Sequence, residues 1–287
     1  MDTEFEPILA SSKIAIWGLG LMGGSLALGL RGRCASLMAI DHDSQTLSLA
    51  REMNIVERIS LHPEEIIPYA DVIILATPMH VILQSLRRLP ELHPGKAIVL
   101  DIGSTKRQVV GAMDELPPRF DPIGGHPICG KETSRLENAQ ANIFVGAPFV
   151  FTPLARTSSR ARMFAERLAL SLGSKPLWMD PLAHDQWIAA TSHLSHLIAL
   201  ALASATPLEA ALLIGPSFRS MTRIANSPPT LIGEMLRTNR DCLRQALDRF
   251  RAQLDRLEEE LFNNDGEGFE ATIRQIGEHL KTLLYDS

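Results

Sequence analysis

The sequence predicts a protein of the α/β class, in which a doubly wound, mostly parallel sheet is followed by an all-helical region. Three observations support this prediction. Short apolar runs alternate with helical patterns, a glycine-rich turn follows the first run, and strand-like runs stop at about Pro181. Strands that alternate with helices form parallel sheets covered on both faces. We therefore predict two domains in the 287 residues, residues 1–180 and residues 181–287.

The predicted strands of the first domain are short and rich in β-branched residues. Each is separated from the next by enough chain for a crossover helix. The predicted strands are Lys13–Trp17, Leu37–Ile40, Val72–Ala76, Ala97–Leu100, Phe120–Ile123, Pro148–Thr152 and Lys175–Met179.

The second domain carries helical patterns only. A long helix is predicted over residues 184–206, where apolar side chains recur every three to four positions. Two later seams, Leu243–Leu261 and Phe269–Leu283, alternate steps of four and three, as in helices that bury one stripe against a partner. These seams can form an intramolecular core, a dimer interface, or both.

Composition narrows the class of protein. Hydrophobic residues make up 45% and charged residues 21%, which is ordinary for a soluble globular chain. The net charge of −5, with acids and bases interspersed, argues against a nucleic-acid partner. No apolar run was expected to reach the roughly 20 residues of a membrane span, and the acidic N-terminus is no signal peptide. Three distant cysteines fit no disulfide framework or metal site, so we expect a cytoplasmic protein without metal.

The first predicted strand leads into a GxGxxG turn at residues 18–23. In such a turn the first glycine permits the tight bend, the second lets a pyrophosphate approach the backbone, and the third lets helix and strand pack closely. Free amides at the helix start favour phosphates. The sequence thus predicts a Rossmann-type dinucleotide-binding domain. The expected cofactor contacts in this turn are Gly18, Leu19, Gly20, Met22 and Gly23.

An acidic residue, Asp41, ends the second predicted strand. At this distance from the glycines it would bind the ribose hydroxyls and repel a 2′-phosphate, which points to NAD over NADP. The alternative is a solvated turn aspartate, and basic residues nearby leave NADP open. Thr77 and Pro78 follow another strand and are expected to meet the cofactor at the carboxyl edge of the sheet.

Three further segments carry unusual polar residues: 101–106 after one strand, 124–130 after the next, and 191–196 on the predicted helix. The carboxyl ends of strands face the ligand crevice in open α/β sheets, so Ser104 and His126 should lie near one another. A histidine between glycines and a proline has little packing of its own to satisfy. We therefore predict a functional role for His126, with loop stabilisation as the alternative.

Taken in order, the GxGxxG turn, the GS-x-K segment, the GGHP-x-x-G segment and an S-H-L-x-H helix resemble the prephenate/arogenate dehydrogenase family. Residues 218–225 are similar to that family's FRD-x-TRIA segment. The resemblance covers nearly the whole chain. It implies an NAD-dependent homodimer with a helical dimerisation domain, and oxidative decarboxylation of prephenate in tyrosine biosynthesis. Arogenate is the alternative substrate.

The resemblance also implies roles for individual residues. His126 would be the general base, a task for which a neutral histidine has a suitable pKa. Ser104 would orient the imidazole and touch the substrate hydroxyl, and Lys106 would support the same site. Arg223 would hold the ring carboxylate with its planar fork, and His193 would contact the pyruvyl side chain.

The chain departs from the family pattern at a few positions. Lys131 and Glu132, which we also expect at the substrate, stand where the family often has Thr-Glu or a similar pair. Ser195 replaces a proline and Ser220 replaces an aspartate. These changes bear on fine contacts and substrate preference, not on the type of reaction.

Two other functions are compatible with parts of this pattern. The first is another dehydrogenase with a Rossmann and a helical domain, such as a β-hydroxyacid dehydrogenase or an imine reductase. The former usually needs a helix lysine, which residues 184–196 lack. The second is a catalytically silent NAD-binding sensor, which would have no reason to gather the predicted base and its neighbours. His184 and His196 are interpreted as structural.

Overall fold

The computed structural model describes residues 8–131, 133–263 and 267–285. It divides the chain into two compact units, residues 1–240 and residues 241–287. The boundary that the sequence suggested at residue 180 falls within the first unit, where the last strand has just ended at Trp178. A domain division at that point stays a prediction.

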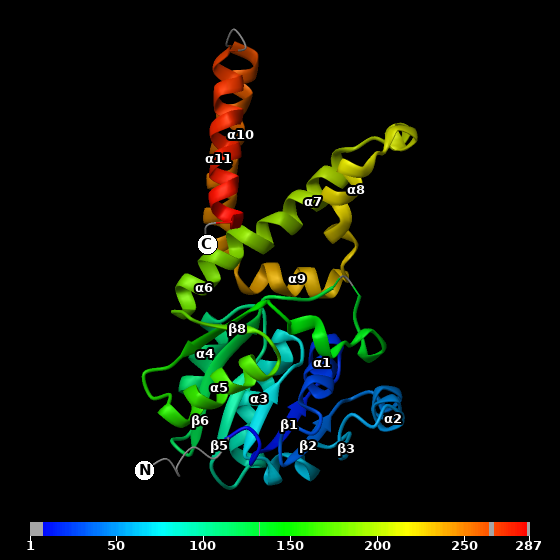
Figure 1. The fold of residues 1–287 in the computed structure, drawn as a ribbon, viewed down its shortest axis with the longest axis vertical. Coiled ribbons are helices and arrows are strands. Elements are labelled where there is room, and N and C mark those ends of the chain that lie inside the picture. The colour runs from blue at the N-terminus through cyan, green and yellow to red at the C-terminus, as the bar shows by residue number, and fades with distance from the viewer. Residues whose placement is uncertain (1–7, 132, 264–266, 286–287) are drawn as a thin grey trace. The chain divides into compact units, whose positions relative to one another are not determined.

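The first unit is built on an eight-stranded sheet in the order β3-β2-β1-β4-β5-β6-β7-β8 (Figure 1). All neighbouring strands are parallel except β6 and β7. This confirms the doubly wound, mostly parallel sheet. The strands are β1 (Lys13–Trp17), β2 (Ser36–Ile40), β3 (Arg58–Ser60), β4 (Val72–Leu75), β5 (Ala97–Asp101), β6 (Phe120–Pro127), β7 (Pro148–Pro153) and β8 (Lys175–Trp178).

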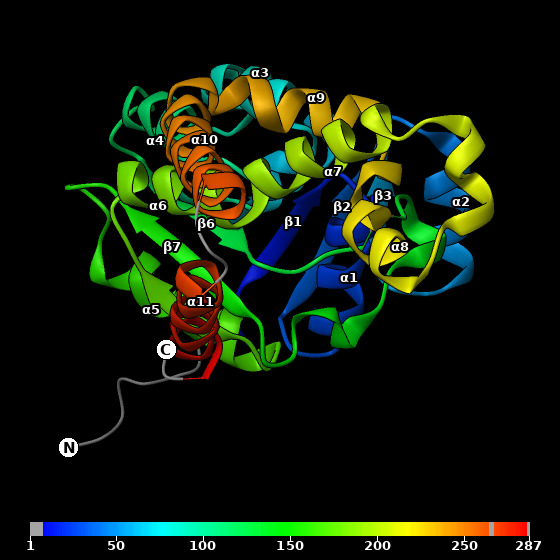
Figure 2. The ribbon, with the colours of Figure 1, turned by 90° about the horizontal axis from the view of Figure 1, so that it is seen from above.

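Helices cover both faces of this sheet, and Figure 2 shows α3 and α4 on one side with α1 and α5 on the other. One apolar cluster packs α1, α2 and α5 against the sheet, and a second cluster packs α3 and α4. The central strand β4 is buried along its whole length, as a strand between two helical layers must be. These helices are α1 (Leu21–Leu30), α2 (Ser44–Glu52), α3 (Met79–Leu92), α4 (Arg107–Asp114) and α5 (Ser159–Ser171).

The long helix predicted after the sheet is present and begins at Pro181, where the Asp180 carboxylate accepts hydrogen bonds from Leu182 N and Ala183 N. A π-helical turn, η5 (Ala189–His193), separates α6 (Pro181–Ile188) from α7 (Leu194–Ala205). Such turns are frequent at functional sites. The unit continues through α8 (Pro216–Thr222) and α9 (Pro229–Thr238). The 3₁₀ turns are η1 (Pro63–Glu65), η2 (Ile67–Tyr69), η3 (Leu136–Asn138), η4 (Ala141–Phe144), η6 (Leu208–Leu213) and η7 (Arg223–Asn226).

The stretch Pro181–Ala205 corrects one expectation from the sequence. It is long and apolar enough, by length and composition, to cross a membrane, with a mean hydropathy of 1.4. Asp185, Gln186 and the polar residues of 191–196 interrupt the apolar run, so the sequence shows no unbroken apolar run of that length. Only 22% of that window is buried, so an apolar face is open in the single chain. A partner subunit can cover such a face, and one such helix is weak evidence for a membrane.

The second unit holds α10 (Arg240–Asn263) and α11 (Glu267–Tyr285), the two helices that carry the predicted seams. A hydrogen bond between Thr272 and the Glu260 carboxylate joins them. Several seam positions are nevertheless about half exposed, including Leu254, Ile273 and Leu280 at 52% each. A single chain therefore does not fill these seams.

Candidate active site

The glycine-rich turn links β1 to α1 in the way the sequence predicts. Gly18 has a φ of +104°, and a Cβ on Gly23 would lie 1.9 Å from the Gly18 carbonyl oxygen, so a side chain is excluded at both positions. Gly20 precedes α1 without a side-chain cap, and the space around its Cα is open. The first amides of α1 are therefore available to an anion.

The carboxylate of Asp41 fastens this turn to the end of β2. Its Oδ2 accepts a hydrogen bond from Leu19 N at 2.7 Å, and its Oδ1 accepts one from Asp43 N at 3.0 Å. The residue is 8% exposed, so it is not the solvated turn aspartate of the alternative interpretation. Oδ1 also lies 3.2 Å from His42 Nδ1, while Oδ2 keeps a lone pair that can accept a hydroxyl. The geometry thus fits a ribose, although Leu19 N itself is already used.

Thr77 lies beside the glycine-rich turn, at the carboxyl end of β4. A Cβ on Gly18 would meet its methyl group at 2.8 Å. Its hydroxyl oxygen is buried and has no hydrogen-bond partner within the described residues. A buried polar group of this kind calls for a ligand or water. Pro78 and Met22 contribute partly or fully exposed surface at the same edge. These residues fit a bound dinucleotide.

The strand that carries His126 is longer than predicted. The sequence suggested an end at Ile123, but β6 continues to Pro127 because residues 124–127 pair with β7 in antiparallel fashion. Its pairing with β5 stops at Ile123. A Cβ on Gly125 would lie 2.7 Å from the Asp101 carbonyl oxygen, so the glycine lets β6 pass close to the end of β5. His126 therefore projects from a strand, just beyond the point where β5 ends.

A buried ion pair lies beneath this strand. Lys106 Nζ donates to Asp101 Oδ2 and, at 2.5 Å, to the Gly125 carbonyl oxygen; both charged residues are 0% exposed. Asp101 also accepts from Gly103 N and Gly125 N. Burial lowers the pKa of Lys106, and the Asp101 carboxylate acts against that shift. Lys106 thus holds β5 and β6 together, and its ammonium group is not exposed to a ligand.

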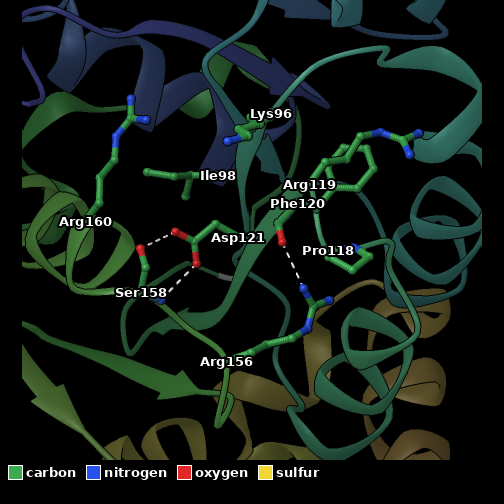
Figure 3. Close-up of a pocket in the computed structure, with 10 residues that line it drawn as sticks. Lys96, Ile98, Pro118, Arg119, Phe120, Asp121, Arg156, Ser158 and Arg160 are labelled. Atoms are coloured by element: carbon green, nitrogen blue, oxygen red, sulfur yellow. Dashed lines mark hydrogen bonds between the residues drawn. The ribbon is translucent and has the colours of Figure 1, made fainter.

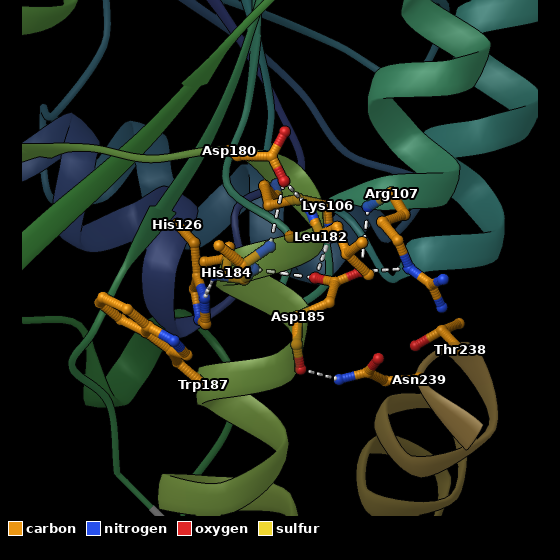
Figure 4. Close-up of polar contacts among 12 residues, drawn as sticks. Lys106, Arg107, His126, Asp180, Leu182, His184, Asp185, Trp187, Thr238 and Asn239 are labelled. Atoms are coloured by element: carbon orange, nitrogen blue, oxygen red, sulfur yellow. Dashed lines mark hydrogen bonds and ion pairs between the residues drawn. The ribbon is translucent and has the colours of Figure 1, made fainter. Parts of the chain in front are cut away.

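His126 is joined to α6 by a line of hydrogen-bonded side chains (Figure 4). His126 Nδ1 lies 2.9 Å from His184 Nε2, and His184 Nδ1 lies 2.8 Å from Asp185 Oδ1. The Asp185 carboxylate accepts further bonds from Lys106 N at 2.7 Å and Arg107 N at 3.0 Å. Nε of Arg107 lies 3.5 Å from Asp185 Oδ2. The Asp185 carboxylate on α6 therefore binds the start of α4 directly and is linked to the end of β6 through His184.

The environment keeps the side chains of His126 and His193 neutral. Burial, followed by the neighbouring His184, Lys106 and His193, lowers the pKa of His126 well below its ordinary value of 6.5. Burial lowers the pKa of His193 to about 4, against the opposing effect of Asp185. A neutral imidazole can accept a proton at pH 7. The site therefore contains a histidine suited to general-base chemistry.

The other predicted site residues lie in different settings. Ser104 follows β5 and is partly exposed, as is His126. His193 is 0% exposed and contacts Asn239 Nδ2 at 3.3 Å, while its Nε2 is buried without a partner in the described part of the chain. Arg223 opens η7 and is exposed, and Lys131 is exposed in the loop after β6. Glu132 lies outside the described residues.

Comparison with known proteins identifies the family. The model for the prephenate dehydrogenase nucleotide-binding domain matches residues 26–175, and the model for the prephenate dehydrogenase dimerization domain matches residues 180–275. The chain belongs to the prephenate dehydrogenase family. The matched segments include the GGHP strand and the long helix, but the first begins after the glycine-rich turn.

Individual relatives agree with this family. Prephenate dehydrogenase of Bacillus subtilis is 29% identical over 88% of this chain and 71% of its own length. Prephenate dehydrogenase of A. aeolicus, crystallised with hydroxyphenyl propionate and NAD+, superposes with a TM-score of 0.88 at 26% identity, over 96% and 99% of the two chains. Synechocystis arogenate dehydrogenase gives a TM-score of 0.82 at 29% identity, over 95% and 100%.

Several residues of this site were missed by sequence reasoning. Asp101 lies in the segment 101–106 noted above, but no role is predicted for it. Its place at the end of an apolar strand is the sequence signal that could have identified it as a site residue. His184 was interpreted as structural, and its neighbour Asp185 was not considered. Asn239 follows α9 and is 0% exposed, and its Nδ2 donates a hydrogen bond of 2.6 Å to the Asp185 carbonyl oxygen. No local sequence pattern predicts this contact. No group of three or more possible metal ligands occurs within the residues described.

A separate hollow of about 320 Å³ opens at the opposite edge of the sheet, where β5 and β6 begin (Figure 3). Its lining is basic, but two of its arginines, Arg119 and Arg156, are engaged by backbone carbonyl oxygens. Arg156 donates to the carbonyl oxygens of Phe120, Met113 and Leu116. Arg119 donates to Pro90 O at 2.6 Å. These side chains hold strand and helix ends together, and the Asp121 carboxylate among them would repel an anion.

Proposed function

We propose that this chain is a cytoplasmic NAD-dependent dehydrogenase that converts prephenate to 4-hydroxyphenylpyruvate and CO2, a step of tyrosine biosynthesis. The observation that carries the proposal is the neutral His126 at the carboxyl edge of a dinucleotide-type sheet, joined to a buried carboxylate through His184. Membership of the prephenate dehydrogenase family supplies the reaction class.

NAD would be held by residues that the sequence already suggested. The start of α1 would receive the phosphates and Asp41 would accept the ribose hydroxyls. The Thr77 hydroxyl, which has no partner among the described residues, would hydrogen-bond to the cofactor. Bound NAD would accept a hydride. The carboxylate of Asp41 would disfavour the 2′-phosphate of NADP.

The protein's own side chains need to move only one proton in this reaction. His126 Nε2 would take the proton of the ring hydroxyl while the hydrogen on the same carbon leaves as hydride. The ring carboxylate is then lost as CO2, and its bonding electrons restore an aromatic ring with a phenolate oxygen. His126 would return the proton to that oxygen. The net products are 4-hydroxyphenylpyruvate, CO2 and NADH, with no proton gained or lost.

The substrate is an anion with two carboxylates, so we propose that cationic side chains hold it. Arg223 is proposed for the ring carboxylate, because a guanidinium fork matches a carboxylate. Ser104 would contact the hydroxyl, and Lys131, Glu132 and His193 remain proposed for the pyruvyl end. Arogenate carries an ammonium group where prephenate carries a keto group, so one charge at that end would decide the preference. The similarity to an arogenate dehydrogenase makes arogenate the second candidate.

We also propose that the active species is a homodimer formed through the helical region. The half-exposed seam on α10 and α11 and the open face of Pro181–Ala205 both need a covering surface. Light scattering at micromolar concentration should report twice the 31.6 kDa of one chain. A monomer under these conditions would contradict this part of the proposal.

The activity is tested by following NADH absorbance with prephenate and with arogenate, and by identifying each product by mass. We expect turnover of prephenate with release of CO2 in a 1:1 ratio to NADH. The His126→Asn variant should lose 10²- to 10⁴-fold in kcat while it still binds NAD. Turnover of arogenate alone would select the second candidate, and turnover of neither would overturn the proposal.

A further inference from the structure

His184 and Asp185 form a second layer of side chains behind the predicted base. They are 2% and 1% exposed, so neither reaches a ligand in the site. Both lie in the first turns of α6, on a different element from His126 (Figure 4). The imidazole rings of His126 and His184 meet edge to face, with centroids 5.1 Å apart. This arrangement leaves one ring nitrogen of each histidine facing the other.

The direction of these hydrogen bonds follows from the carboxylate at the end of the line. Burial opposes ionisation of Asp185, but the hydrogen bonds from His184, Arg107 N and Lys106 N outweigh it and hold the pKa of Asp185 below its ordinary value. An ionised carboxylate only accepts hydrogen bonds, so Nδ1 of His184 must carry the hydrogen. With its one hydrogen on Nδ1, the His184 ring presents Nε2 as an acceptor. Nδ1 of His126 must therefore donate to it.

We propose that His184 and Asp185 are positioning residues that hold His126 in the single tautomer with a bare Nε2, the form that can act as a base. This proposal rests on the proposed function only for the identity of the proton that Nε2 takes. The tautomer itself is a property of the free protein. Without the acceptor at His184, the ring of His126 is free to place its hydrogen on either nitrogen.

The surrounding charges fit this assignment. His126 faces His184 from α6, His193 from the π turn and the ammonium of Lys106 from the start of α4. Burial and the Lys106 ammonium disfavour a positive charge on the His126 ring, so it rests in the neutral form. When Nε2 takes a proton, the Nδ1 bond to His184 is retained, and the Asp185 carboxylate stabilises the new imidazolium through the His184 ring. The proton can then be returned to the product oxygen.

The backbone donors around Asp185 make its orientation difficult to replace. Oδ1 receives Lys106 N and His184 Nδ1, and Oδ2 receives Arg107 N. In Asp185→Asn, an amide group at Oδ2 would point its hydrogens at Arg107 N. The alternative orientation would turn them toward Lys106 N and His184 Nδ1, and a hydrogen bond to His184 Nδ1 would reverse the whole line of hydrogen bonds. The expected result is a His126 ring protonated at Nε2.

The test reads the tautomer directly in the full-length protein labelled with ¹⁵N-histidine. Long-range ¹H–¹⁵N spectra distinguish a bare ring nitrogen from a protonated one, and the His126→Asn variant identifies the His126 signals by their loss. In the wild type without substrate we expect a bare Nε2 and a protonated Nδ1. A bare Nδ1 in that spectrum would overturn the proposal, whatever substrate the enzyme uses.

Variants extend the test to function. His184→Leu removes the acceptor and should give mixed His126 tautomers, with kcat lower by about 10²-fold and KM nearly unchanged. His184→Gln offers an amide oxygen to His126 Nδ1 and should recover part of that loss. The matched control is His93→Gln, which removes another buried histidine with two hydrogen bonds at a distance from the site. It should alter neither the tautomer nor kcat.

The outcomes separate positioning from simple structural support. A purely structural role would lower the melting temperature of His184→Leu and His93→Gln alike, and would leave the His126 signals of both variants in the wild-type pattern. That result would overturn the proposal. If His184→Leu does not fold, the wild-type spectrum and the His184→Gln variant still distinguish a positioning role from a structural one. Failure of the enzyme to use prephenate would leave the spectra, and therefore this inference, intact.

Discussion

Replacing Lys106 with methionine should destabilise the protein strongly. The substitution keeps the length of the side chain and removes the ammonium group, which leaves the Asp101 carboxylate at 0% exposure without its counter-charge. Two backbone amides, Gly103 N and Gly125 N, would still donate to it. They satisfy hydrogen bonds but carry no net charge. The carboxylate must then stay ionised in an apolar setting or take up a proton.

The loss of unfolding free energy in Lys106→Met is set by the buried Asp101 carboxylate, which is left without its counter-charge. Breaking a buried ion pair by removing one partner typically costs about 3–5 kcal/mol. A protein of ordinary stability has about 5–15 kcal/mol in total, so this is a large fraction. Asp101→Asn should cost a similar amount, because it removes the counter-charge of the buried ammonium and points an amide NH2 group at one of the backbone donors, Gly103 N or Gly125 N. The double variant leaves neither charge unpaired, and should lose less than the sum of the two by about 2 kcal/mol or more.

Urea unfolding of the wild type, both single variants and the double variant measures this coupling free energy. Lys96→Met serves as the matched control, because Lys96 is an exposed lysine near the opposite edge of the sheet and should change stability by no more than about 0.5 kcal/mol. Single variants that each cost less than about 1 kcal/mol, with strictly additive effects in the double variant, would refute the reasoning from the ion pair.

Three further predictions concern the cofactor, the substrate and pH. NAD should give a higher kcat/KM than NADP because the Asp41 carboxylate repels a 2′-phosphate, and a preference for NADP in a side-by-side assay would contradict this role. Arg223→Ala should lower kcat/KM for prephenate by roughly 30- to 1000-fold with NAD affinity unchanged, and Arg223→Lys should recover only part; a lower melting temperature with unchanged KM would instead indicate a structural arginine. Burial lowers the pKa of His193 from 6.5 to about 4, so between these values the unfolded chain binds a proton that the folded chain does not. The stabilisation, about 3 kcal/mol, is complete above pH 6.5 and is lost as the pH falls to about 4. His193→Gln should flatten the fall of melting temperature in this range, and an unchanged slope would count against the assignment.

The sheet was predictable because its strands are short apolar runs that local pattern identifies. Seven predicted strands are present, most within one residue of their predicted ends, since strands buried on both faces are apolar throughout. The missed strand β3 (Arg58–Ser60) is three residues long and has only one buried position. A segment of this kind is a strand because Met38 to Ile40 of β2 lie beside it, and its own sequence carries no such signal.

The site was predictable only in part, for a related reason. Glycine, histidine and lysine in the segments after β5 and β6 mark the edge of the sheet where ligands bind, so His126 and Ser104 were identified. The length of β6 was not, because residues 124–127 are stabilised by pairing with β7, about 25 residues later in the chain. The sequence predicts that Lys106 supports the site of His126, but not that it is buried. Its burial depends on Asp101 and Gly125, whose contacts are set by the fold.

The hydrogen bonds of Asp185 connect the chemistry to the join between the sheet and the helices that follow it. Its carboxylate is held by the start of α4, and its carbonyl oxygen accepts a hydrogen bond from Asn239 at the end of α9. His126 receives its orientation from α6 through His184, so correct placement of α6 is a condition for a usable base. The same helix then leads into the π turn, where it carries His193. A change that loosens α6 from α4 should therefore reduce kcat before it reduces cofactor binding, since the hydrogen bonds of Asp41 go to Leu19 N and Asp43 N, in the β1–α1 and β2–α2 connections.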